Sequence, residues 1–149
     1  MPILGLACAL AACSPKTPGE PQGTVDASTP RAAAPAAGGG APSSAELGER
    51  IFNGNCVACH QPGGVGIPGV YPSLVHSPVV LGDPAELARW VIKGQRPASM
   101  PAGRYSTQML QFGWLKPVDA AALFTYLRSN LGNSAAPVDA ETVAKALGQ

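Results

Sequence analysis

Apolar residues recur at helical spacing in three segments of the chain, and stretches rich in Gly and Pro separate these segments. In the first segment, Leu47, Ile51 and Phe52 share one face of a helix. The pattern begins near Ser44 and stops just before Cys56, where a Gly-Asn pair ends it. We therefore predict a helix over this segment.

In the second segment, the first four residues, Asp83 to Glu86, carry three signals that each mark the start of a helix. Asp suits the N-cap, Pro suits the first helical position, and Glu suits the position three residues after the cap. Leu87, Trp90 and Val91 then form an apolar stripe, and Gly94 is a typical stop signal. These features predict a second helix.

Pro117 and Asp119 open the third segment, and Gly132 follows its end. Its apolar face is broad and consists of Ala121, Leu123, Phe124, Leu127 and Leu131. A short fourth helix, from about Asp139 to Leu147, has a weaker pattern. Because no run alternates with a period of two for long, we expect an all-α fold of three to four helices.

Two long segments between the helices, residues 61–82 and 95–116, are predicted to be loop because Gly and Pro are frequent in them. Loops of this length are uncommon in a compact domain. Aromatic residues make up only 5% of the chain and supply little apolar volume for a core. Both observations are accounted for if the loops wrap around a buried cofactor.

The N-terminal residues 1–12 are apolar but too few to span a bilayer, which needs about 20 residues. They resemble the apolar region of a secretory signal peptide, although no basic residue precedes Lys16, so we expect the natural start to lie upstream. Leu10-Ala11-Ala12-Cys13 resembles the bacterial lipobox. That resemblance implies cleavage before Cys13 and acylation of its thiol, and an ordinary cleaved signal peptide is the alternative.

This N-terminus predicts a lipid-anchored protein on the periplasmic side of a bacterial membrane. Ser14 after the cysteine slightly favours the outer membrane, and the soluble periplasm is the alternative location. Residues 13–45 are predicted to be the lipidated end and a linker, because residues 14–45 hold six Pro, five Gly, eight Ala and no aromatic residue. A flexible chain of this length reaches about 30 Å. We assign residues 46–133 to the folded domain and residues 134–149 to a C-terminal tail with a short helix.

Residues Cys56-Val57-Ala58-Cys59-His60 form the C-x-x-C-H pattern that attaches c-type haem. Two thiols three residues apart on a helical turn can reach two vinyl groups of one porphyrin, and the adjacent His is then held at the iron. A zinc site usually needs a second pair of ligands, whereas Cys8 and Cys13 fall in the signal segment. A thioredoxin-like site needs a strand–helix context that the pattern lacks. We therefore predict one haem c, covalently bound through Cys56 and Cys59, with His60 on the iron.

Beyond this motif, the chain resembles class I cytochromes c, especially the small bacterial ones that accompany alcohol dehydrogenases and related periplasmic enzymes. The resemblance covers about residues 46–133. It rests on residues 56–60, on Gly66-Ile67-Pro68-Gly69-Val70-Tyr71-Pro72-Ser73-Leu74, on Phe112-Gly113-Trp114 and on Leu123-Phe124-Thr125-Tyr126-Leu127-Arg128-Ser129-Asn130. It implies a small cytochrome c fold whose long loops surround one haem.

The resemblance also implies residue roles around the haem. Pro72 would accept a hydrogen bond from Nδ1–H of His60, which fixes the imidazole, and Leu74 would pack on the porphyrin edge. Trp90 and Trp114 would lie near the haem or donate to a propionate through the indole N–H. Core packing is the alternative for both tryptophans.

Met100 and Met109 are the candidates for the second axial ligand. Met100 precedes Pro101, and Met-Pro is the common ligand dipeptide of the resembled family. Met109 instead has the family's spacing, since it lies just ahead of Phe112-Gly113 and of the third helix. We favour Met109, with Met100 as the alternative. A Met ligand would raise the reduction potential relative to two His ligands.

Charge adds little to this picture, because charged residues make up 13% of the chain and the net charge is +1. That balance argues against a nucleic-acid partner, which needs a concentrated basic surface. The positive run Arg89, Lys93, Arg96 and Arg104 is most simply a solvated face. Contacts with haem propionates or with an acidic docking partner are the alternatives.

The predicted function is one-electron transfer between a periplasmic or membrane redox enzyme and an acceptor, by a protein that is not itself an enzyme. Its expected partners are a dehydrogenase, reductase or oxidase and the membrane. The alternative is a haem enzyme with peroxidase-like activity, which needs an open iron position and an acid–base residue above it. Only His76 could supply that residue, and an exposed loop position is the simpler interpretation of it.

Overall fold

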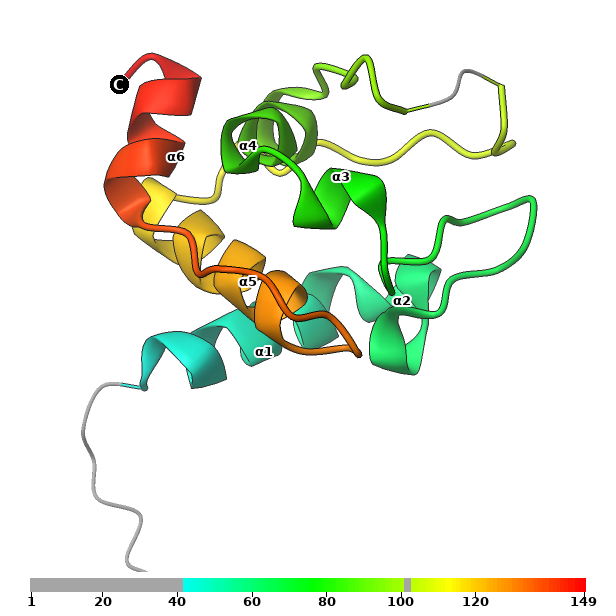
Figure 1. Ribbon diagram of the computed structural model, residues 1–149, viewed down its shortest axis with the longest axis horizontal. Helices are drawn as coiled ribbons and strands as arrows, with labels where there is room; N and C mark the ends of the chain where they lie inside the picture. The colour runs from blue at the N-terminus through cyan, green and yellow to red at the C-terminus, as the bar shows by residue number, and fades with distance from the viewer. Residues whose placement is uncertain (1–41, 101–102) are drawn as a thin grey trace, which may run out of the picture. The chain divides into compact units, whose positions relative to one another are not determined.

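The computed structural model describes residues 42–100 and 103–149, which form six α-helices and one short 3₁₀ turn (Figure 1). The elements are α1 (Ser44–Asn55), α2 (Val57–His60), η1 (Pro62–Gly64), α3 (Pro78–Leu81), α4 (Pro84–Lys93), α5 (Pro117–Ser129) and α6 (Ala140–Leu147). The described residues contain no strand, and one isolated bridge joins Ile67 to Tyr71. The predicted all-α fold class is confirmed.

Three predictions fall outside the described residues: the signal peptide at residues 1–12, the acylation of Cys13, and the linker as far as residue 41. Within the described ranges, no helix is both long and apolar enough to cross a membrane.

The predicted helix starts are confirmed, and each has a hydrogen-bonded cap or a Pro in its first turn. At α1, the Ser43 hydroxyl accepts a hydrogen bond from the Glu46 N–H, while the Glu46 carboxylate accepts one from the Ser43 N–H at 2.8 Å. At α4, the Asp83 carboxylate accepts from the Ala85 N–H at 2.9 Å. Gly94 ends α4 in the left-handed conformation, which a residue without Cβ adopts without strain.

The long loop predicted for residues 61–82 is wrong in one respect, because it contains η1 and the single-turn helix α3. Ser77 caps α3 by accepting a hydrogen bond from the Val80 N–H, and Pro78 occupies its first turn. This Ser-Pro pair is the same start signal as Asp83-Pro84 a few residues later. The helix is only four residues long, so it has no apolar periodicity by which to detect it.

The core lies where α1 crosses α5 (Figure 1). Phe52 from α1 and Phe124 from α5 are almost fully buried, and the Phe52 ring packs against the Tyr126 ring at 5.6 Å between centroids. Gly48 allows the close approach of the two helices, because a Cβ built there would overlap the Ala122 carbonyl and lie 2.8 Å from Cβ of Tyr126.

We expect Gly48→Ala to destabilise the protein by about 2 kcal/mol, because overpacking at the crossing outweighs the gain in helix propensity. Gly54→Ala is the matched control in the same helix, where a Cβ would meet nothing within 4 Å. It should leave stability unchanged or raise it by about 0.5 kcal/mol. Urea unfolding of both variants provides the comparison, and equal stabilities would contradict the assigned role of Gly48.

The C-terminal residues pack onto the domain and are not a separate tail. Helix α6 contacts α4 and α5, and its Val143 is fully buried. The Lys93 ammonium at the end of α4 donates to the Leu147 carbonyl at 2.6 Å. Residues 134–149, set apart from the domain on sequence grounds, therefore belong to the same compact unit as α4 and α5.

Candidate functional site

The corner between α1 and α2 brings the residues of the C-x-x-C-H motif to one cavity. Helix α1 ends as the Cys56 N–H donates to the Phe52 carbonyl at 2.8 Å, and the His60 N–H donates to the Cys56 carbonyl at 2.8 Å. This single helical turn directs Cys56, Cys59 and His60 to the walls of a cavity of about 720 Å³. Both thiols are free.

The imidazole of His60 is held in one tautomer. Its Nδ1 lies 2.9 Å from the Pro72 carbonyl oxygen, and a carbonyl can only accept, so Nδ1 carries the proton and Nε2 keeps a free lone pair. Burial lowers the pKa of His60, and the hydrogen bond to Pro72 opposes this shift in part. The side chain, only 7% exposed, is thus kept neutral, which is the form that binds a metal.

Backbone hydrogen bonds fold the segment after His60 so that Pro72 returns to the imidazole. The Gly66 N–H donates to the His60 carbonyl at 2.7 Å, and the Leu74 N–H donates to the Gly64 carbonyl at 2.7 Å. Pro72, predicted to accept from His60, and Leu74, predicted to pack on the porphyrin edge, both line a second, smaller cavity of about 250 Å³, and Pro72 lines the larger cavity as well.

Asn133 holds this segment against the end of α5, and sequence reasoning missed it. Its buried side-chain amide donates to the Leu127 carbonyl at 2.7 Å and to the Leu74 carbonyl at 3.0 Å, and its oxygen accepts from the His76 N–H at 2.7 Å. An Asn after the stop signal Gly132 looks like an ordinary turn residue in the sequence. Its partners are remote along the chain, so only the fold reveals its role.

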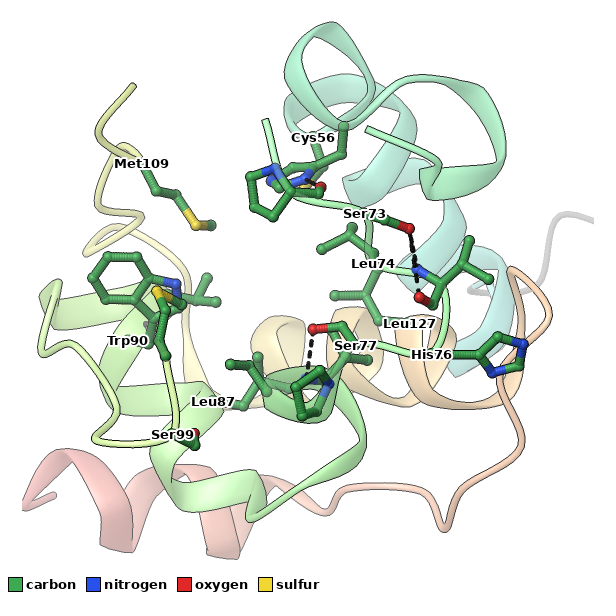
Figure 2. A pocket seen from close by; sticks show the side chains of 18 of the residues that line it. Cys56, Ser73, Leu74, His76, Ser77, Leu87, Trp90, Ser99, Met109 and Leu127 are labelled. Atoms are coloured by element: carbon green, nitrogen blue, oxygen red, sulfur yellow. Dashed lines mark hydrogen bonds between the residues drawn. The ribbon is translucent and has the colours of Figure 1, made fainter. Parts of the chain in front are cut away.

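His76 is exposed, and Figure 2 shows its ring directed away from the cavity although its residue lies at the wall. The backbone at His76 has φ +51°, a conformation held by the hydrogen bond to Asn133. This orientation does not offer an acid–base group to the interior of the cavity.

The two cavities adjoin and share part of their walls, including Cys56, His60, Trp90, Met100 and Met109. Figure 2 shows the Met109 side chain directed into the cavity, with its sulfur near the tip. Among the described residues, no Asp or Glu lines either cavity. The space is therefore largely apolar, with two thiols, one imidazole and two thioethers as its ligand-type groups.

The loop that carries Met109 is tied to both sides of the cavity. The Phe112 N–H donates to the Val91 carbonyl of α4 at 3.0 Å, and the Ser106 N–H donates to the Gly69 carbonyl at 3.3 Å. Met100 follows a tight turn in which its N–H donates to the Pro97 carbonyl at 3.1 Å. The fold thus brings both candidate methionines to the cavity wall.

The two tryptophans predicted to lie near the haem differ in position. Trp90 lines both cavities, as does Tyr105, and Tyr71 lines the larger one. Trp114 lines neither; it is 64% exposed and packs edge-to-face on Phe112 at 6.3 Å between ring centroids. The structure therefore does not bring Trp114 to the site, because the chain turns outward between Phe112 and Leu115, whose N–H donates to the Phe112 carbonyl.

Of the four residues in the positive run, Arg96 and Arg104 lie at a cavity wall. Arg89 lies 4.0 Å from the Asp83 carboxylate, and Lys93 is bonded to the end of α6. The run is thus divided between the cavity and the helix surface.

Two alternative uses of the cysteine pair do not fit this geometry. A redox-active C-x-x-C site lowers the pKa of a thiol, whereas burial and the neighbouring Cys59 raise the pKa of Cys56 to about 11. Residues 42–100 and 103–149 contain no group of three or more His, Cys, Asp and Glu side chains that could hold a metal ion, as a zinc site requires.

A family model described as cytochrome c matches residues 45–130. The chain belongs to the cytochrome c family. Membership implies covalently bound haem c and haem-based electron transfer. A search of curated proteins gives no match.

The residues present fit the haem of a c-type cytochrome. A cavity of about 720 Å³ is in the size range of cofactor sites. Its wall combines two free thiols for thioether bonds with a buried, neutral imidazole whose Nε2 is available. Apolar side chains from α3, α4 and α5, among them Val80, Leu87 and Leu127, complete the enclosure.

Proposed function

We propose that this cytochrome is a single-haem electron carrier, in which Cys56 and Cys59 attach the haem and His60 and Met109 are its axial ligands. The observation that carries the proposal is that a buried imidazole with a free Nε2 and the thioether of Met109 line the same cavity. The bound haem supplies a one-electron couple. The surrounding residues determine how that couple is held and tuned.

Each proposed ligand has a defined role. The bond from Nδ1 of His60 to Pro72 fixes the plane of the ring and makes Nε2 a stronger donor. Met109 supplies a soft thioether, which raises the reduction potential. With both His60 and Met109 bound, the iron would have no open position for a substrate.

The same arrangement weighs against peroxidase-like chemistry. That chemistry needs an acid–base group above the iron, yet none of the Asp and Glu residues that the structure describes lines the cavities, and the His76 ring points away from them. Electron transfer needs only an enclosed haem with an accessible edge. The carrier function therefore requires fewer groups than the enzyme, and the residues proposed to attach and ligate the haem line the cavity.

We further propose that the carrier works on the periplasmic side of a bacterial membrane, anchored through acylated Cys13 and the linker of residues 13–45. Its partner would be a membrane or periplasmic dehydrogenase, reductase or oxidase. This part of the proposal is supported by the lipobox-like sequence and by the composition of the linker. Labelling with a radioactive fatty acid tests it, with Cys13→Ala as the variant that should lose the label.

Optical and redox titrations of the holo protein test the carrier function. We expect a low-spin spectrum in both oxidation states, a reversible one-electron couple, and slow binding of cyanide. A high-spin ferric spectrum that reacts rapidly with peroxide would instead identify an enzyme with an open iron site.

A further inference from the structure

Arg128 on α5 is a buried cation that the site described above does not use. Its side chain is only 6% exposed. One guanidinium nitrogen donates to the Val80 carbonyl at 2.7 Å and to the Gly82 carbonyl at 2.9 Å, and Nε donates to the Ala136 carbonyl at 2.8 Å. Three backbone carbonyls from two remote segments therefore surround this one charge.

Within the described residues, Arg128 forms no ion pair with a carboxylate, and the ion pair found there joins Arg89 to Asp83. An Arg side chain does not lose its proton in proteins. Carbonyl dipoles satisfy its N–H groups without cancelling the unit charge. The domain thus holds a permanent positive charge in its interior, an arrangement that is unfavourable unless something offsets it.

This charge lies directly behind the cavity wall. Val80, whose carbonyl accepts from Arg128, is almost fully buried and lines the smaller cavity. Leu127, the residue before Arg128, lines the same cavity. The guanidinium is therefore hydrogen-bonded to a residue of the cavity wall, and because it is buried there, water screens its charge poorly.

We infer that Arg128 is a positioning residue that fixes α3 as a wall of the haem cavity and raises the reduction potential of the haem through its charge. The inference rests on the proposed carrier function. When the haem accepts one electron from a redox partner, its net charge falls by one. The reduced haem repels a nearby buried cation less than the oxidised haem does, so the cation stabilises the reduced state and raises the reduction potential.

The test compares the reduction potential of the full-length holo protein with those of Arg128→Gln and Arg128→Lys. We expect Arg128→Gln to lower the equilibrium constant for reduction several-fold. A tenfold change in this constant corresponds to a shift of about 59 mV in the reduction potential of a one-electron couple. Arg128→Lys keeps the charge and should stay close to the parent protein. The difference between the two variants should persist at high salt, because buried charges are screened weakly.

A purely structural role would lower the stability of Arg128→Gln and leave its potential at the parent value, and this result would overturn the inference. A holo protein without a reversible one-electron couple would instead refute the proposed carrier function. The two failures are therefore distinguishable.

If Arg128→Gln does not fold, Ala136→Asp and Ala136→Asn replace it in the test. Ala136 is exposed and its carbonyl accepts from Arg128, so an Asp there adds a negative charge on the residue whose carbonyl holds the guanidinium and leaves the hydrogen bonds in place. Ala136→Asp should lower the equilibrium constant for reduction relative to the uncharged Ala136→Asn. Equal potentials for the two would overturn the inference.

Discussion

Replacing Met109 by alanine is expected to change the ferric haem from low spin to high spin and to lower the reduction potential. The methyl side chain cannot reach the iron, and the thioether that stabilises the reduced state is lost. We expect the potential to fall by an amount of the order of 0.1 V, a modest part of the roughly 0.8 V that axial ligands span. The long-wavelength band typical of thioether-bound ferric haem should disappear from the optical spectrum.

Met100→Ala is the matched control, because Met100 lines both cavities as well. It should keep the low-spin spectrum and nearly the parent potential. If the band is lost in Met100→Ala and kept in Met109→Ala, the ligand is Met100 and our assignment is wrong. Absence of the band from the parent protein itself would show that no methionine binds the iron.

Gly66→Ala is expected to destabilise the domain by about 3 kcal/mol and to weaken the hydrogen bond that orients the His60 ring. Gly66 has φ +69°, and a Cβ there would lie 2.5 Å from the Tyr71 carbonyl oxygen and 2.6 Å from the Pro72 carbonyl oxygen. The left-handed conformation adds about 1 kcal/mol for a residue with a Cβ, and the overlap adds about 2 kcal/mol more. The Pro72 carbonyl must move, and it is the acceptor that holds His60.

Gly63→Ala separates the two contributions, since Gly63 has φ +74° in the same segment and a Cβ there would meet nothing within 4 Å. It should cost only about 1 kcal/mol, the conformational part. Urea unfolding of both holo variants measures the stabilities, and the reduction potential reports on the His60 bond. Similar losses in both variants would show that contact with Pro72 does not matter.

The sequence was sufficient to predict the features that depend on local chemistry. Caps and Pro residues locate α1, α4 and α5, because these signals act within one helical turn. The C-x-x-C-H spacing likewise predicts that the two thiols and the imidazole lie together at one site, because these residues lie on one helical turn. Helix α3 escaped prediction because four residues are too few to show a period.

Features that depend on the path of the chain could not be predicted in this way. Trp114 shares a motif with Phe112, yet the turn between them directs one ring to the cavity and the other to solvent. In the sequence, Asn133 and Arg128 look like surface residues at the end of a helix. In the structure both are buried, and both donate hydrogen bonds to backbone carbonyls that are remote along the chain. The role of a polar residue at such a position depends on which segments the fold places within hydrogen-bonding distance of it.

The crossing of α1 and α5 also has a consequence for assembly. Every residue that lines either cavity lies between Asn55 of α1 and Leu127 of α5, so the crossing closes one large loop around the haem. Closing a loop of this length has an entropic cost that the Gly48 contact must offset. The two thiols lie near the start of that loop, so haem can bond to them before α5 packs on α1. A chain in which the packing of α1 on α5 is weakened would therefore carry its haem while the loop around it stays open.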